Sequence, residues 1–140
     1  MTSYLVVAHQ TATSPELAER VSELVSDDPE ASFTLLVPAT PVDHFLVWEE
    51  GETHQIAHKR AEEARVLLEG LGAKVAGIGV GDSSPLLAIE DELRTHPQEY
   101  DAIILSTFPP GVSRWLRLDV HNQAERKFNI PLIHVVAEKR

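Results

Sequence analysis

The chain has 140 residues, 43% of them hydrophobic and 24% charged, with a formal net charge of −10 at pH 7. Length and composition predict one globular domain, residues 1–140, and exclude a disordered chain. The negative charge argues against nucleic acid and against an anionic membrane surface as partners. The chain has no cysteine, which excludes disulfides, thiol catalysis and cysteine-ligated metals.

The first part of the chain predicts two strands with a helix between them. An apolar run at residues 4–8 predicts a strand. Ser14-Pro15 then supplies an N-cap and a first-turn proline for a helix that continues to about residue 26. A second apolar run at 33–37 predicts a strand that ends at Pro38. Residues 39–51 have no clear period, and so long a connection is often functional or mobile.

Three further apolar runs follow, each preceded by a helical pattern. A helix begins at Thr53, with Gly72 as its C-cap, and it leads to a strand at 74–80. Its predicted buried stripe consists of Ala57, Ala61, Ala64, Leu67, Leu68 and Leu71. Ser84-Pro85 repeats the cap-and-proline signal for a helix that ends near His96. The last strands are predicted at 101–105 and 132–136.

The segment after the fourth strand has the chemistry of an anion site. Pro109-Pro110-Gly111 cannot continue a strand, and Ser113 can cap a helix that begins at Arg114. In open α/β sheets the ligand crevice lies just past the carboxyl ends of the strands. Free backbone N–H groups, hydroxyls and guanidiniums at that edge suit an anion such as phosphate. The residues concerned are Ser106, Thr107, Gly111, Ser113, Arg114 and Arg117.

The regular alternation of strands and helices predicts an α/β fold, with a parallel sheet, helices on both faces and right-handed crossovers. The whole pattern resembles the universal stress proteins over nearly the full length. The most telling parts are residues 80–89, 101–105 and 130–136. The Ser-Thr-Phe-Pro-Pro-Gly-Val-Ser-Arg-Trp-Leu segment at 106–116 is similar to a divergent, actinobacterial-type branch of that family.

The resemblance implies a three-layer α/β/α sandwich with five parallel strands in the order 3-2-1-4-5, and a crevice between strands 1 and 4. It also implies a homodimer paired through strand 5, at Leu132, His134 and Val136. In family members that bind a nucleotide, the end of strand 2 flanks the adenine. That position corresponds to Val37 and Pro38, whose contribution would be backbone hydrogen bonds.

The nucleotide signature of the family is degraded in this chain. Nucleotide-binding members carry Gly, two residues, Gly, nine residues, then Gly followed by Ser or Thr. The matching positions here are Leu105, Phe108, Leu118 and Asp119. Asp119 would place a negative charge where the family uses a hydroxyl for phosphate. The acidic residue that these members carry after strand 1 is replaced by Ala8-His9-Gln10.

Other constellations are weaker. His54 and His58 are four apart on a helix, half of a zinc site, but Gln55 replaces the glutamate of the metalloprotease motif. We expect two solvated histidines and no metal. Glu90, Asp91 and Glu92 are consecutive, which is typical of a solvated surface. A Gly-x-Ser-x-Gly elbow and a Walker loop are both absent from the sequence.

These patterns favour a cytoplasmic, non-catalytic regulatory or ligand-sensing module with no required cofactor and a small anionic ligand. Two alternatives stay open: an ATP- or AMP-binding universal stress protein, and a weak phosphohydrolase with His9 as base. The expected ligand contacts are His9, Gln10, Val37, Pro38, Ser106, Thr107, Gly111, Ser113 and Arg114. His134 is expected at the dimer seam, where its protonation would weaken association at mildly acidic pH.

Overall fold

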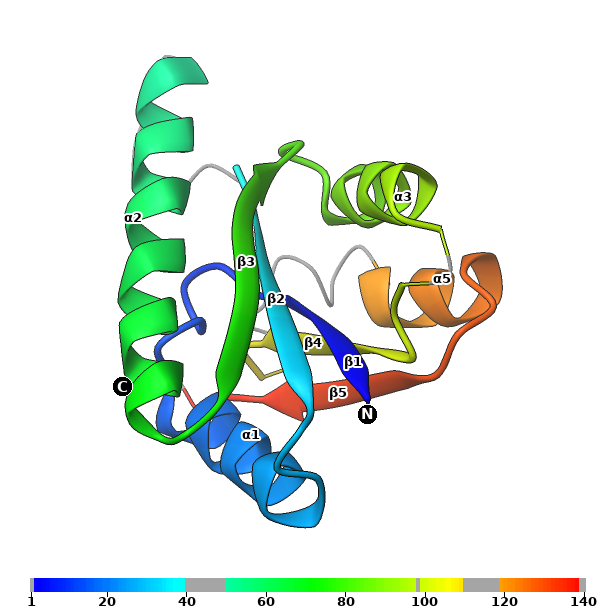
Figure 1. Ribbon diagram of the computed structural model, residues 1–140. Coiled ribbons are helices and arrows are strands. Elements are labelled where there is room, and N and C mark those ends of the chain that lie inside the picture. The colour runs from blue at the N-terminus through cyan, green and yellow to red at the C-terminus, as the bar shows by residue number, and fades with distance from the viewer. Residues whose placement is uncertain (1, 40–49, 98, 110–118, 139–140) are drawn as a thin grey trace.

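The computed structural model describes residues 2–39, 50–97, 99–109 and 119–138. Strands and helices alternate along the chain (Figure 1). The strands are β1 (Ser3–Val7), β2 (Ser32–Pro38), β3 (Lys74–Gly81), β4 (Ala102–Thr107) and β5 (Leu132–Val136). The helices are α1 (Pro15–Asp27), α2 (Glu50–Gly70), α3 (Pro85–Thr95) and α5 (Val120–Lys127). None of these helices is long and apolar enough to cross a membrane.

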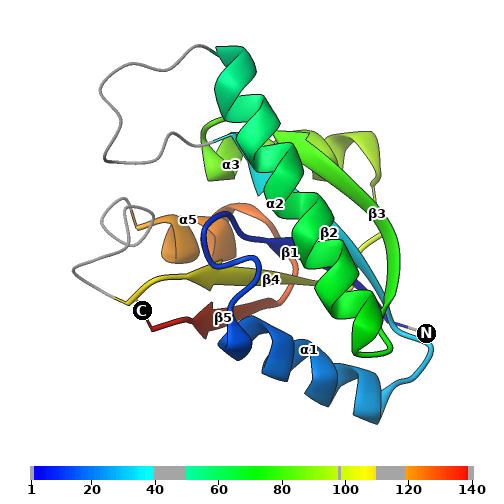
Figure 2. The same ribbon diagram turned by 90° about the vertical axis from the view of Figure 1, so that its left-hand side faces the viewer.

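The five strands form one parallel sheet in the order β3-β2-β1-β4-β5, which confirms the predicted fold class and strand order. Helices α1 and α2 cover one face, and α3 and α5 cover the other (Figures 1 and 2). This arrangement explains the continuous apolar runs, because a strand between two helical layers buries both of its faces. In β1, Val6 packs under α1 and α2, whereas Leu5 and Val7 pack under α3 and α5.

The cap signals in the sequence form as expected. Ser14 accepts a hydrogen bond from the backbone of Leu17 at 3.2 Å, and Ser84 caps α3 in the same way. After α2, the Ala73 N–H donates to the Leu68 carbonyl at 3.1 Å across Gly72, whose φ is +93°. Such a left-handed link strongly favours glycine, so Gly72 ends this helix as predicted.

Two details of α2 differ from the sequence prediction. The helix begins at Glu50 rather than Thr53. Its buried stripe is narrower than predicted, because Leu67 is 37% exposed and Leu71 is 41% exposed. The fully buried residues are Ala57, Ala61, Ala64 and Leu68.

The fourth strand is longer than predicted. The apolar run suggested an end at Leu105, but β4 pairs with β5 through Ser106 and Thr107. Both hydroxyl residues are buried, with 1% and 2% of their surface exposed. The helix start expected at Arg114 lies outside the described residues, and the helix described in this region, α5, begins at Val120 and buries Val120, Ala124 and Phe128. Ser113 and its expected capping role lie outside the described residues.

Candidate functional site

The carboxyl ends of β1 and β4 lie side by side. Val7 is in register with Leu105, so the loop that follows each strand begins at the same edge of the sheet. The Ser106 hydroxyl donates a hydrogen bond of 2.7 Å to the Thr11 hydroxyl in the loop after β1. This confirms that the chain leaves β4 at the tip of β1, where a doubly wound sheet has its ligand crevice. Sequence analysis missed Thr11, because nothing in the loop pattern distinguishes it from its polar neighbours.

His9 begins the loop after β1 and is buried, with 6% of its surface exposed. Its Nε2 atom has no hydrogen-bond partner among the described residues. Burial, and secondarily the charge of Arg60, lowers the pKa of His9 to about 4. The imidazole is therefore neutral at pH 7, and one of its two ring nitrogens is buried without a hydrogen-bond partner among the described residues. A buried polar atom without a partner is costly and marks a position where a ligand or a water can bind.

Two further residues near His9, Gln10 and Arg60, differ in their exposure to solvent. Gln10, also a predicted contact, is exposed to solvent. Arg60 of α2 is half-buried, and its charge acts on His9. The helical pattern could not show this, because only the packing of α2 over the sheet brings Arg60 near the β1 loop.

Thr107 joins β4 to a pair of histidines. Its hydroxyl donates to the Phe108 carbonyl at 2.9 Å and lies 2.8 Å from His134 Nε2. Since the hydroxyl proton is used, Thr107 accepts from an Nε2–H of His134, which fixes the tautomer. The His134 ring stacks on His121 of α5 at a centroid distance of 5.1 Å. Burial, followed by the charge of His121, lowers the pKa of His134, against a smaller opposite effect of Glu125.

The carboxyl end of β2 lies at the same edge of the sheet as the ends of β1 and β4. Val37 and Pro38 are buried and pair with Val80 and Gly81 of β3. The register between β1 and β2 stops one residue earlier, where the Ala8 N–H donates to the Leu36 carbonyl at 3.3 Å. Backbone groups at the end of β2 therefore lie next to the β1 loop that holds His9. Three other predicted contacts, Gly111, Ser113 and Arg114, lie outside the described residues.

Asp119 stands at the position where the nucleotide signature of the family has Ser or Thr. In this chain its side chain stabilises the start of α5. Its φ is +58°, its Oδ1 accepts from the Asn122 side chain at 2.7 Å, and its Oδ2 lies 3.7 Å from Arg126. The carboxylate is thus occupied at the start of α5. A hydroxyl at this position in the family would be free to bind phosphate, whereas this carboxylate would repel it.

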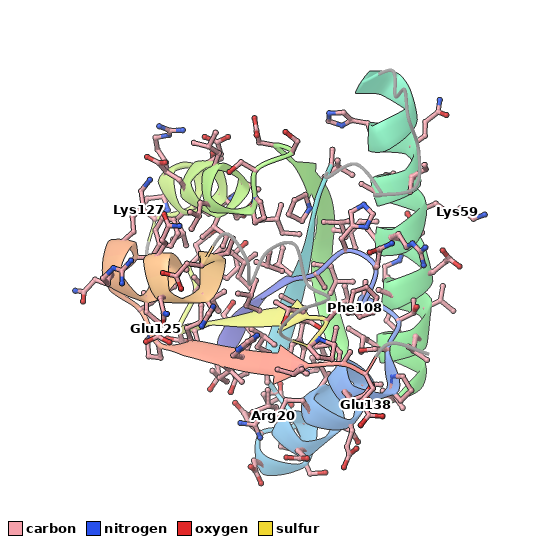
Figure 3. All side chains as sticks on the ribbon, turned by 180° about the vertical axis from the view of Figure 1, so that it is seen from behind. Arg20, Lys59, Phe108, Glu125, Lys127 and Glu138 are labelled. Atoms are coloured by element: carbon pink, nitrogen blue, oxygen red, sulfur yellow. The ribbon has the colours of Figure 1, made fainter. Side chains whose placement is uncertain are left out.

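The other constellations are surface features in the described part of the chain. His54 and His58 are exposed, and no group of three or more potential metal ligands occurs there. The three consecutive acids of α3 each have a different partner. Glu90 accepts from Lys127 of α5 at 3.0 Å, and Lys127 is labelled in Figure 3. Asp91 pairs with Arg94, and Glu92 accepts from the Tyr100 hydroxyl at 2.6 Å.

No protein-family model and no curated protein matches the sequence. Solved structures do match. A universal stress protein family member from Burkholderia pseudomallei has a TM-score of 0.64 and 14% identity, over 95% of this chain and 94% of that one. The universal stress protein from Archaeoglobus fulgidus in complex with dAMP has a TM-score of 0.57 and 16% identity, over 96% and 97%.

A universal stress family protein from Arabidopsis thaliana with AMP bound has a TM-score of 0.57 and 12% identity, over 98% of this chain and 92% of that one. Near-complete coverage in both directions shows that the chain has the universal stress protein fold. At these identities the likeness concerns the fold alone.

Proposed function

We propose that the protein is a non-catalytic regulatory or ligand-sensing module of the universal stress class, which binds a small anionic molecule past β1 and β4. The observation that carries this proposal is the buried His9 imidazole with an unpartnered Nε2, close to the positive charge of Arg60. Thr11, bonded to Ser106, adds a hydroxyl at the same edge. A neutral hydrogen-bonding ring beside a cation suits a polar ligand that carries negative charge.

The other ligand contacts in this proposal are those that the sequence predicts. Gly111, Ser113 and Arg114 follow β4 and would offer backbone N–H groups, a hydroxyl and a guanidinium to the anion. The end of β2 would contribute backbone hydrogen bonds from Val37 and Pro38. No cofactor is required for this role, and a cytoplasmic location stays a prediction.

Native mass spectrometry of the purified protein, followed by calorimetry, tests the proposal. We expect a small anionic molecule to co-purify, or else heat on titration with phosphate, AMP or ATP with magnesium. Arg114→Ala should weaken binding about tenfold or more, because a charge-assisted contact is lost. Arg94→Ala is the matched control, since Arg94 is an exposed arginine near the end of α3 that pairs with Asp91. A clean mass spectrum together with no heat at high micromolar ligand would refute the proposal.

A second candidate is an adenine nucleotide, because two structures of the same fold contain AMP or dAMP. Against it stand the occupied carboxylate of Asp119 and the absence of the signature glycines. Calorimetry separates the two cases: AMP binding that phosphate does not compete with indicates recognition of the base. Equal affinity for AMP and phosphate indicates an anion site without an adenine pocket.

Catalysis is disfavoured by the state of His9. A general base works best with a pKa near the working pH, and a pKa of about 4 is too low for that role. The weak phosphohydrolase therefore ranks third. If purified protein releases phosphate from ATP and His9→Ala abolishes that release, the non-catalytic proposal fails.

We also propose that two copies associate through β5, as the resemblance implies. This strand is at one edge of the sheet, and Val136 is 41% exposed. His134 already contacts Thr107 and His121 within its own chain, so its protonation would act on the strand from inside the subunit. Sedimentation at about pH 5.5 and 7.5 tests the expected acid-induced dissociation. Equal association at both values contradicts it.

A further inference from the structure

Arg60 lies at the border of the buried face of α2. The residues one turn before and after it, Ala57 and Ala64, are fully buried, whereas its neighbour Lys59 is exposed and points away from the body of the protein (Figure 3). Figures 1 and 2 both show the loop after β1 beside this helix. The half-buried Arg60 therefore carries its positive charge toward the loop that holds His9.

His9 lies near this charge with a polar atom that has no partner. Only 6% of its surface is exposed, and its Nε2 atom is buried without a hydrogen-bond partner among the described residues. Other described side chains at this edge, such as Thr11, Ser106 and Val37, are uncharged. In the described chain, Arg60 is thus the charge that shifts the pKa of His9.

A bound anion changes the conditions around this imidazole. Without an anion, burial and the Arg60 cation both favour the neutral ring. An anion that contacts both groups offsets the charge of Arg60 and gives Nε2 a partner. The neutral ring has one donor nitrogen and one acceptor nitrogen, whereas the imidazolium donates from both. An anion whose oxygens only accept is therefore bound most strongly by the imidazolium, through a charge-assisted hydrogen bond.

We propose that the protein binds its anionic ligand together with a proton, and that the imidazole of His9 holds this proton next to the ligand and Arg60. The proton comes from solvent and adds to the nitrogen lone pair of the neutral ring, and no bond of the ligand is broken. This inference rests on the function proposed above and specifies how that site is regulated: acid strengthens ligand binding. The module then responds to the ligand and to acidity together.

The size of the effect follows from linkage. An opposite charge in contact changes the proton affinity of a group by about tenfold to a thousandfold, and we take about a hundredfold for His9. The same factor applies to the affinity for the anion, because the two effects are reciprocal. The pKa of His9 is about 4 in the free protein, so above that pH the ring takes up its proton only in the complex. Affinity should then be about tenfold higher at about pH 5 than at about pH 7, with about 0.8 proton taken up at the lower pH.

Calorimetry with sulfate tests the inference, because sulfate itself does not titrate in this pH range. Titrations at about pH 5 and about pH 7, in two cationic buffers of different ionisation enthalpy, give the affinity and the number of protons taken up. His9→Gln should remove the gain in affinity at the lower pH and the proton uptake, while the affinity at the higher pH changes little. A merely structural role of His9 would instead lower the affinity equally at both pH values. His58→Gln is the matched control and should keep both effects, because His58 is an exposed histidine of α2.

A second pair of variants tests the contribution of Arg60. Arg60→Gln should weaken sulfate binding about tenfold or more at both pH values, because a charge-assisted contact is lost. It should also raise the pKa of His9 in the free protein, because a neighbouring cation is removed. Lys59→Gln removes the same charge from the exposed side of α2 and should change the affinity by less than about twofold. Equal effects of the two variants on sulfate affinity overturn the assignment of Arg60 to the site.

NMR of the His9 ring gives a readout that needs no variant to fold. The ring should titrate at about pH 4 without sulfate and at a clearly higher pH with saturating sulfate. Equal sulfate affinity at both pH values, without proton uptake and without a change in this titration, overturns the inference and leaves the proposed function intact. A pH dependence that persists in His9→Gln overturns it too. No heat with sulfate, phosphate or AMP refutes the proposed function and this inference together.

Discussion

The hydrogen bond between Ser106 and Thr11 fastens the loop after β1 to the end of β4. The two hydroxyls are 2.7 Å apart and almost completely buried, with 1% and 3% of the residue surfaces exposed. A hydrogen bond of this kind contributes about 1 kcal/mol, and a buried group left without its partner costs about 1–3 kcal/mol. We therefore expect Ser106→Ala to lower the free energy of unfolding by about 2 kcal/mol.

Urea unfolding of four proteins measures this contact: wild type, Ser106→Ala, Thr11→Val and the double variant. The single changes should not be additive, because the double variant leaves no unpaired hydroxyl, and the coupling should be about 1 kcal/mol. Thermal unfolding should show a loss of about 4 °C per kcal/mol. Ser26→Ala, at an exposed position near the end of α1, is the control and should change stability by less than about 0.5 kcal/mol. Strict additivity of the two single variants would refute the reasoning.

For three further perturbations, the structure determines whether the stability of the fold rises or falls. The pKa of His9 is about 4 when folded, against an ordinary value of 6.5, so the unfolded chain binds the extra proton between these pH values. Stability should therefore fall by up to about 3 kcal/mol on acidification through that window, and His9→Gln should reduce this dependence in urea titrations. Gly81→Ala should cost about 1–3 kcal/mol through its clash with Ala88, whereas Gly79→Ala should be close to neutral; equal effects would contradict the packing. Ser14→Ala should lower the thermal midpoint through loss of about 1 kcal/mol of N-cap stabilisation, and an unchanged midpoint would argue against the cap.

The site could be predicted only in part, and the reason is physical. His9 and Ser106 were predicted because each lies directly after or at the end of an apolar run, and parallel strands end at one edge. Thr11 and Arg60 were missed, because their roles depend on contacts across the sheet. Thr11 meets a residue 95 positions away, and Arg60 reaches the edge from a helix that was assigned by its period alone.

The sequence by itself determined the order of the elements, the caps at Ser14 and Ser84, and the turn at Gly72. These are local features, set by hydrogen bonds and backbone angles within a few residues. Only the tertiary structure decided that His9 is buried and neutral and that β4 extends to Thr107. Burial and pairing depend on which elements pack together in space, and no local pattern contains that information.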